Sequence, residues 1–376
     1  EAVIVADRNA TAAGVIAASV GAKACSRAVD ATNNRSLAEV LLDCDVVVNT
    51  VGPFFRFGPS ILSAAISAGC DYIDVCDDPL PTLDMLELDD RARAAGVTAL
   101  VGMGASPGVS NMLAVVAARE LDTVHSIFTC WDVAGAQPDR PHGEATSAAL
   151  EHGMAQISGE IPVVHGGRLT RRPALERIDI DYPGIGPISG RTFGHPEAVT
   201  MSRAFPELSE CQNVMFGDRP TLAMLSALRW AIAHRVLTAD RAARLAGRVE
   251  RLLSLGGGRL RAGGTPPLFA LAVGRHAGRQ AVVATALAQL PGLSMAANTA
   301  VPLAVATPMV TLAERPGVHT PETLLDPELF LAAFARHCIG SPPPESMLAT
   351  TKSWASPAEN SAVLNSHLLT ALLQHG

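Results

Sequence analysis

Lysine is nearly absent from this sequence of 376 residues. Lys23 and Lys352 are its two occurrences, so a lysine that acts as a base or forms a Schiff base has two possible positions. Arginine supplies the other cations, and the 29 basic residues against 36 acidic ones leave a net charge of −7. This modest acidity argues against a general nucleic-acid binder, which needs clustered basic residues.

Cysteine pairs and long apolar runs are also missing. The seven cysteines are scattered without a C-x-x-C pair, so we expect reduced thiols in a cytoplasmic protein, with neither a disulfide framework nor a metal site. The longest apolar run, residues 299–313, contains Pro302 and Pro308 and is too short to span a bilayer, so no membrane helix is expected. The first residues carry no recognisable signal peptide.

Short β-branched runs alternate with helical stretches over the first 122 residues. A continuous run such as Asp45–Asn49 is typical of a parallel strand that helices cover on both faces. The alternation predicts an α/β domain with a Rossmann-type, doubly wound parallel sheet. The predicted strands are 2–6, 24–29, 45–49, 72–75 and 97–101.

The pattern changes after about residue 123. Residues 163–200 are rich in Gly and Pro and contain short β-like pieces, which predicts a second, α+β domain with a mixed or antiparallel sheet. Residues 268–273 and 280–286 predict a hairpin, and 297–312 an apolar helix. The Pro- and Ser-rich tail over 341–376 is expected to be loosely packed.

Asp7 and Arg8 end the first predicted strand. A carboxylate there can bind the adenosine ribose hydroxyls and favours NAD, whereas the guanidinium of Arg8 can pair with the 2′-phosphate of NADP. A solvated ion pair is an equally open interpretation. The G-x-G-x-x-G turn that holds the pyrophosphate normally lies about twenty residues before this acid. Either that first strand and its Gly-rich loop fall outside this sequence or the protein lacks them.

The ends of later strands carry further candidates for dinucleotide contacts, because ligands bind outside the carboxyl ends of parallel strands. Asp30 ends the second predicted strand, and Asp74 ends the fourth. The third strand runs into a loop whose glycine permits close approach and whose proline restricts the backbone. An ordinary strand-to-helix turn explains this loop equally well. Its candidate residues are Thr50, Val51, Gly52 and Pro53.

Proton-handling candidates are Asp77 and His142. Asp77 belongs to a group of closely spaced carboxylates, which resist simultaneous ionisation, so one of them can be tuned toward a base. Asp78 is better explained as the cap of the next helix. His142 precedes a predicted helix, and its imidazole can exchange a proton near neutral pH, although a surface position fits as well.

Two segments resemble the saccharopine dehydrogenase/reductase-like family: V-V-N-T-V-G-P-F-F-R-F-G at 47–58 and A-G-C-D-Y-I-D at 68–74. The S-P-G-V-S-N segment at 106–111 and G-H-P-E at 194–197 are also similar. The resemblance extends to relatives such as lysine 6-dehydrogenase and carboxynorspermidine dehydrogenase. His195 and Glu197 lie in the last of these segments, where a substrate-facing and a structural role are both open.

This resemblance implies an NAD- or NADP-dependent oxidoreductase that transfers hydride at a carbon bearing nitrogen in a small amine or amino-acid substrate. It also implies a second domain inserted late in the first: residues 1–122 bind the dinucleotide, 123–296 bind substrate and dimerise, and 297–340 return to the first domain. A homodimer is expected of such an enzyme. A homospermidine synthase-like aminoalkyl transfer and a non-catalytic interaction protein remain as alternatives.

Overall fold

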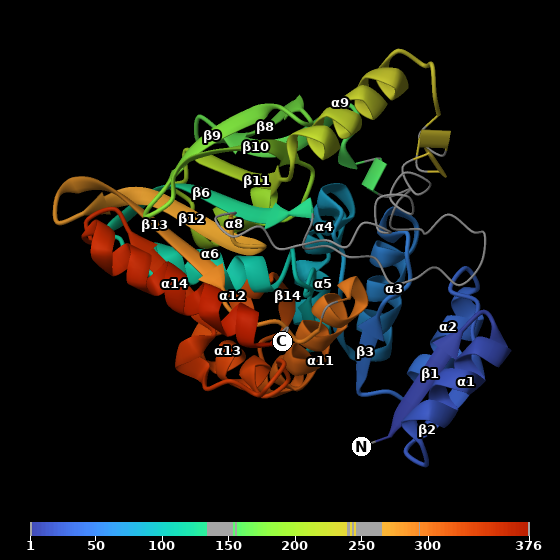
Figure 1. The fold of residues 1–376 in the computed structure, drawn as a ribbon. Coiled ribbons are helices and arrows are strands. Elements are labelled where there is room, and N and C mark those ends of the chain that lie inside the picture. Colours follow the sequence, from blue (N-terminus) through green and yellow to red (C-terminus); the bar gives the residue numbers. More distant parts are fainter. Residues whose placement is uncertain are drawn as a thin grey trace.

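The computed structural model describes residues 2–133, 153–154, 156–238, 241–242, 244–245, 265–292 and 294–374, the last eight as backbone. A parallel α/β domain and a domain built on a large mixed sheet lie side by side (Figure 1). The predicted fold class is therefore confirmed, whereas the proposed domain boundaries stay a prediction.

The first domain alternates strands and helices as the sequence predicts. One difference concerns the acidic-then-basic stretch 83–95, whose pattern predicts a single helix. It belongs to two helices, and the first begins at Pro79 with Asp78 at its N-cap position but no side-chain cap bond. The elements are β1 (Val3–Asp7), α1 (Ala10–Val20), β2 (Ala24–Ala28), α2 (Asn34–Leu41), β3 (Val46–Asn49), α3 (Phe54–Ala68), β4 (Asp71–Asp74), α4 (Pro79–Leu86), α5 (Asp89–Ala95) and β5 (Thr98–Leu100).

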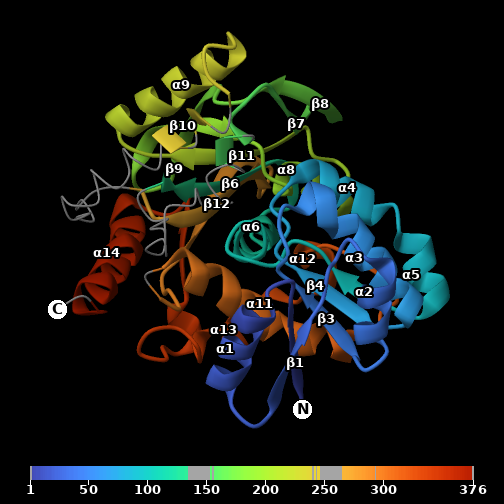
Figure 2. The ribbon, with the colours of Figure 1, turned by 90° about the vertical axis from the view of Figure 1, so that its right-hand side faces the viewer.

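Local chemistry explains where these helices begin and end. The side chain of Asn9 accepts bonds from the first amides of α1, and Asn33 does the same for α2. Helix α3 ends at Gly69, whose φ of 74° suits glycine. Buried side chains such as Leu62 and Tyr72 then pack α3 onto the sheet. Figure 2 shows α3 and α5 on one face of this sheet and α11 on the other.

The parallel strands fall into two groups, with the order β14-β5-β4-β3 in one and β1-β2 in the other. Among the described strands, β1 and β3 each have one edge without a hydrogen-bonded neighbour. Val3 on β1 and Val48 on β3 are 46% and 45% exposed, although the strands between β3 and β14 are buried. One more parallel strand between β1 and β3 would make the sheet continuous.

The second domain contains a nine-stranded sheet with the order β15-β13-β12-β6-β11-β10-β9, to which β7 and β8 add at β11. All its pairs are antiparallel except β6 with β11. The predicted hairpin is confirmed as β12 and β13. The elements are α6 (Val109–Arg119), β6 (Thr123–Asp132), β7 (Glu160–His165), β8 (Arg168–Pro173), β9 (Arg177–Tyr182), β10 (Gly186–Phe193), α8 (Glu197–Ala204), β11 (Glu210–Phe216), α9 (Arg219–Ala233), β12 (Leu268–His276) and β13 (Arg279–Leu287).

The chain then returns to the first domain. Helix α11 (Met295–Ala313) packs against β4 and β5, and β14 (Gly317–His319) pairs with β5. Within the described residues, α11 is the helix that is long and apolar enough to cross a membrane by length and composition, because it begins at Met295 and extends beyond the apolar run 299–313. In the structure its Leu303 and Val310 are buried in the core that joins the two domains.

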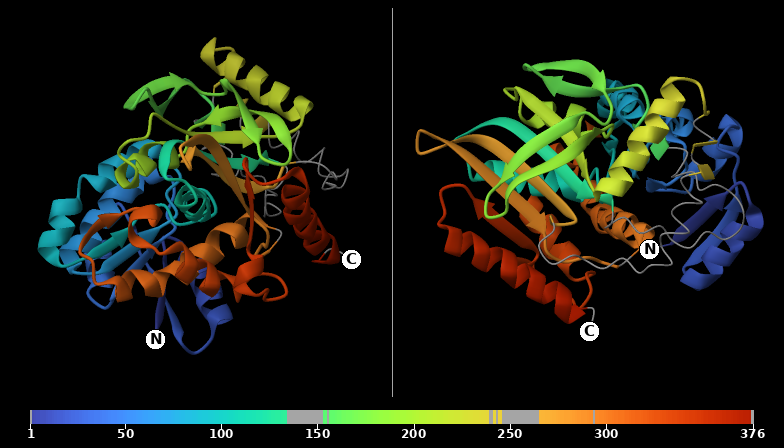
Figure 3. Two further views of the ribbon diagram at one scale, coloured as in Figure 1. Left: turned by 90° about the vertical axis from the view of Figure 1, so that its left-hand side faces the viewer. Right: turned by 45° about the horizontal axis from the view of Figure 1, so that its top comes forward.

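The C-terminal tail is packed more tightly than its composition predicts. After α12 (Pro321–Leu324), α13 (Pro327–Ala335) and η3 (Pro344–Ser346), strand β15 (Leu348–Lys352) pairs antiparallel with β13. Ala349 and Thr351 are buried and alternate with more exposed neighbours, as in a strand with one buried face. The strand has 5 residues, which is too few for this alternation to be recognised in the sequence. Helix α14 (Pro357–Gln374) then lies beside the hairpin, as the red helix in Figure 3.

Candidate functional site

The residues predicted to contact a dinucleotide follow the carboxyl ends of β1, β2 and β3. Asp7, Arg8, Asp30 and the loop 50–52 are exposed, and Pro53 is half-buried. Hydrogen bonds from Thr32 lower the pKa of Asp30, and the charges of Arg8 and Arg56 lower it further. The structure therefore gathers two guanidinium groups near Asp30, and Arg56 was not singled out from the sequence.

Asp74 has a different environment from the other candidates, because it is fully buried. Its Oδ1 accepts bonds from the amides of Cys76 and Gly102, at 3.0 and 2.7 Å, and its Oδ2 accepts one from the Tyr72 hydroxyl at 2.8 Å. Burial raises the pKa of the Asp74 carboxyl to about 6, against the opposing effect of these bonds. The side chain thus fixes the loops after β4 and β5, which favours an indirect role in ligand binding.

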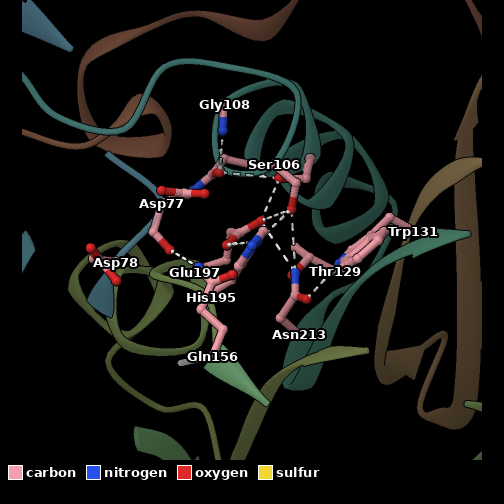
Figure 4. A network of polar contacts seen from close by, with 12 residues as sticks. Asp77, Asp78, Ser106, Gly108, Thr129, Trp131, Gln156, His195, Glu197 and Asn213 are labelled. Atoms are coloured by element: carbon pink, nitrogen blue, oxygen red, sulfur yellow. Dashed lines mark hydrogen bonds and ion pairs between the residues drawn. The ribbon is translucent and has the colours of Figure 1, made fainter. Parts of the chain in front are cut away.

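Two of the candidate site residues, His195 and Glu197, lie in a polar network between the domains (Figure 4). Ser106, on the loop after β5, donates from Oγ to Glu197 Oε1 at 2.5 Å and lies 3.2 Å from His195 Nδ1. Ser110, in the first turn of α6, donates to the same Glu197 oxygen at 2.7 Å. Asn213 on β11 adds a third donor at 3.3 Å.

The loop that presents Ser106 has a shape that requires glycine. Gly108 has φ 119°, and a Cβ atom there would lie 2.2 Å from the carbonyl oxygen of Gly104. The Gly104 amide in turn donates to the Pro107 carbonyl at 2.8 Å. This tight turn ends β5 and starts α6, so Ser106 and Ser110 reach the second domain from a fixed backbone.

Glu197 is fully buried, whereas 9% of the His195 side chain remains exposed. The three donors that converge on Glu197 Oε1 suit an ionised carboxylate, whose oxygens only accept hydrogen bonds. Glu197 Oε2 lies 3.7 Å from His195 Nδ1, so this carboxylate favours a positively charged imidazole. The imidazole also stacks on Trp131, with 6.0 Å between ring centroids and 17° between planes.

Asp77 lies beside this network and joins the domains through its backbone. Gln156 donates from Nε2 to the Asp77 carbonyl at 2.7 Å, and both residues appear next to His195 in Figure 4. Because Asp77 follows β4 and Ser106 follows β5, both stand at the sheet edge where ligands bind in such folds. His142 lies outside the described residues, as does most of the helix predicted over 143–157.

Sequence reasoning missed the residues of β6 and β11 that complete the network. Asn213 donates to Thr129 Oγ1 at 3.0 Å and accepts from Trp131 Nε1 at 3.0 Å. Asn213 and Thr129 are fully buried. The one signal available was a polar pair, Gln212 and Asn213, inside an otherwise apolar strand.

A second buried carboxylate borders the same network. Asn111 donates from Nδ2 to Glu322 Oε2 at 2.6 Å and accepts at Oδ1 from the amide of Gly108, and this Oδ1 lies 3.4 Å from the Ser110 hydroxyl oxygen. Burial raises the pKa of Glu322 above its ordinary value. Ser110 and Asn111 therefore stand between Glu197 and Glu322 at the start of α6.

Comparison with known proteins assigns the first domain. Residues 1–100 match the family model described as the saccharopine dehydrogenase NADP binding domain. The N-terminal domain is saccharopine dehydrogenase-like. The resemblance read from its sequence is confirmed, and NAD or NADP is the cofactor of such a domain. The fold of the longer chain agrees, since apo saccharopine dehydrogenase (L-Glu forming) from Saccharomyces cerevisiae superposes with a TM-score of 0.54 at 18% identity, covering 89% of this chain and 91% of that one.

Curated relatives match over a shorter part of the chain. The carboxyaminopropylagmatine dehydrogenase of Synechocystis is 23% identical over 233 residues, 56% of this chain and 54% of that protein. The carboxynorspermidine synthase of Vibrio cholerae is 25% identical over 210 residues, 52% of this chain and 49% of that protein. The chain thus spans about half the length of these relatives.

The exposed residues of the saccharopine dehydrogenase-like domain fit the ribose end of a dinucleotide. Asp7 offers a carboxylate, although its Oδ1 already accepts the Asn9 amide at 2.6 Å, and Arg8 and Arg56 offer guanidinium groups. The first amides of α1 are bonded to Asn9, so they do not serve a pyrophosphate. Within the described residues, the side chains named here therefore fit the ribose of the dinucleotide and its 2′ substituent, and the amides that begin α1 do not fit its pyrophosphate.

Proposed function

We propose that this protein is an NADP-dependent oxidoreductase that transfers hydride at a carbon bearing nitrogen in a small amine or amino-acid substrate. The observation that carries this proposal is the His195–Ser106–Glu197 network, which stands beside the carboxyl edge of a saccharopine dehydrogenase-like domain. The names of the matched relatives, dehydrogenases and synthases of carboxylated amines, support the same chemistry.

A bound nicotinamide supplies or accepts the hydride at its C4 position. The chain must then handle one proton, because an amine loses a proton before it becomes an imine and an imine gains one before it is reduced. We assign this exchange to Nε2 of His195. Glu197 stabilises the charged imidazole, and Trp131 orients its ring. We assign binding of the substrate nitrogen as a cation to Asp77, whose backbone is bonded to Gln156 beside this network.

Neither lysine supports a covalent route through a substrate imine. Lys23 directly precedes β2 and so lies at the amino end of that strand, opposite its carboxyl end, and Lys352 on β15 is paired with Glu120 at 2.6 Å. The buried network contains neither of them (Figure 4). This leaves hydride transfer with proton exchange at a histidine as the chemistry that the site supports best.

We prefer NADP to NAD because Arg8 directly follows Asp7, the proposed ribose ligand, and because Arg8 and Arg56 both act on Asp30 at the end of the adjacent strand. A guanidinium pairs well with a phosphate dianion. The R8A and R56A variants should each weaken NADPH binding about tenfold and leave NADH binding nearly unchanged, since one charge-assisted contact contributes about 1.4 kcal/mol or more. Calorimetric titration with both nucleotides measures this, and an equal loss for NADH would contradict the preference.

The proposed reaction is tested by nicotinamide absorbance, with putrescine or L-lysine as the amine and pyruvate or 2-oxoglutarate as the carbonyl partner. We expect NADPH oxidation that requires both organic substrates. The H195Q variant should lower turnover about 100-fold and leave the Kd for NADPH unchanged, because proton transfer contributes on that order. H125Q, which alters an exposed histidine on β6, is the matched control. Product formation without net NADPH oxidation would instead support aminoalkyl transfer.

A further inference from the structure

Ser106 lies between the two ionisable side chains of the network, His195 and Glu197. Its Oγ is within hydrogen-bond distance of both His195 Nδ1, at 3.2 Å, and Glu197 Oε1, at 2.5 Å. We propose that Ser106 relays a proton between the His195 imidazole and the buried Glu197 carboxylate. This inference rests on the proposed function for its purpose, although the relay itself can be tested without a substrate.

The relay moves one proton without any net oxidation. When His195 accepts a proton from the substrate at Nε2, its Nδ1–H bond breaks and a new O–H bond forms at Ser106. The original Ser106 O–H bond breaks at the same time, and its proton joins Glu197 Oε1 to give a neutral carboxylic acid and a neutral imidazole. The reverse step returns the proton, so the serine is unchanged and no outside reactant is needed.

Burial is the reason that this relay is favourable. A charged imidazole and a carboxylate at 3.7 Å attract each other, but both are poorly solvated, because Glu197 is fully buried and His195 nearly so. Neutralising the pair removes two desolvated charges at once. The hydroxyl also supplies the contact that the direct pair lacks, since 3.7 Å exceeds hydrogen-bond distance.

Other titratable groups face Glu197 from each neighbouring element. Glu322 on α12 is joined to it through Asn111 and Ser110 on α6, and its raised pKa keeps a larger fraction protonated. Cys211 on β11 and Cys130 on β6 are buried thiols whose pKa values burial raises, and the Glu197 charge raises them further. These thiols therefore remain neutral near pH 7, so among the groups named here His195 is the one that can exchange a proton with Glu197 through Ser106.

Ser110 provides a matched control for Ser106. Both hydroxyls donate to Glu197 Oε1, at 2.5 and 2.7 Å, but of these two hydroxyls it is Ser106 that lies within hydrogen-bond distance of His195 Nδ1. The S106A and S110A variants therefore remove the same kind of hydrogen bond from the same oxygen atom. S106T keeps a hydroxyl at the relay position and tests for rescue.

The experiment is nitrogen NMR on the whole chain with labelled histidines, where H195Q identifies the His195 signals. In the unaltered chain we expect a Nδ1–H tautomer whose proton exchanges slowly with water. S106A should shift His195 toward the Nε2–H tautomer and accelerate exchange at Nδ1 at least about tenfold, because the hydrogen-bond partner is gone. S110A should leave both observables within about twofold, and S106T should restore them.

Equal changes in S106A and S110A, or no change in S106A, would overturn the relay. The turnover assay with NADPH gives a second readout: S106A should shift the acid limb of the pH profile, whereas S110A lowers turnover at an unchanged profile. Failure of NADPH binding in the unaltered chain would refute the proposed function alone, since the NMR measurement does not use the nucleotide.

Discussion

Asp74 shows how a residue with the right position for a ligand can instead support the loops around it. Its pKa is raised to about 6, mainly by burial, whereas the unfolded chain has an ordinary aspartate. The folded protein therefore holds an extra proton between about pH 4 and pH 6, so stability is highest below this range and is lost as pH rises through 6.

The D74N variant should remove this dependence. Asparagine keeps an acceptor for the Cys76 and Gly102 amides but carries no charge. We expect the unaltered chain to lose roughly 2–3 kcal/mol of stability relative to D74N between pH 4 and pH 7, at about 1.4 kcal/mol for each unit of pKa. Urea unfolding at several pH values measures this, and a difference that does not vary with pH would contradict the raised pKa.

Asn213 stabilises the protein by satisfying the hydrogen-bonding groups of its neighbours. Its removal in N213A deprives the buried Glu197 and Thr129 and the half-buried Trp131 of one hydrogen bond each. The expected loss is about 1–3 kcal/mol in the free energy of unfolding, because unsatisfied buried polar groups are costly. The N213D variant should have a lower free energy of unfolding at pH 7 than at pH 5, because it places a second carboxylate beside Glu197. A stable N213D at pH 7 would argue against an ionised Glu197.

At the scale of elements, β15 protects the edge of the mixed sheet. It covers β13, and Thr350 Oγ1 lies 3.1 Å from Thr285 Oγ1 across the pair. The A349D variant puts a charge on its buried face and should destabilise the protein by about 3 kcal/mol. A358D makes the same change at an exposed position in the first turn of α14, where a negative charge is tolerated. Equal unfolding midpoints for the two variants would show that β15 is dispensable.

Elements with strong local signals were predictable from the sequence. The β12–β13 hairpin and the parallel strand β3 have continuous apolar runs bounded by turns, so their positions follow from local pattern. β15 was missed because five residues after a Pro-rich segment show too little periodicity. The break between α4 and α5 was missed because an acidic-then-basic stretch resembles one continuous helix.

Only part of the candidate site could be predicted from the sequence, for a related reason. His195 and Glu197 stand out through a short segment, but Asn213 and Thr129 meet across 84 positions of sequence, and only the register of β6 against β11 brings them together. Buried polar residues inside apolar strands are the feature that points to such partners. They do not show which strand will be adjacent.

At the scale of the whole molecule, the unpaired edges of β1 and β3 bear on cofactor affinity. A strand inserted between them would make one parallel sheet with the order β2-β1-new-β3-β4-β5-β14. A helix that follows such a strand would point its first amides at the same carboxyl edge as Asp7 and Thr50. Helix N-termini bind phosphate groups in this way, whereas the amides that begin α1 and α2 are already bonded to Asn9 and Asn33.

A chain extended at its N-terminus by a strand, a Gly-rich turn and a helix should therefore bind NADPH at least about tenfold more tightly than the present chain. The R8A change should weaken binding in both chains, because the ribose end is common to them. An extension with the turn glycines replaced by valine is the matched control, since bulky side chains block close approach of the pyrophosphate. Equal affinity for the present chain, the extended chain and the valine control would show that residues of the present chain hold the pyrophosphate. The start of α3, which has no side-chain cap, would then be the first candidate.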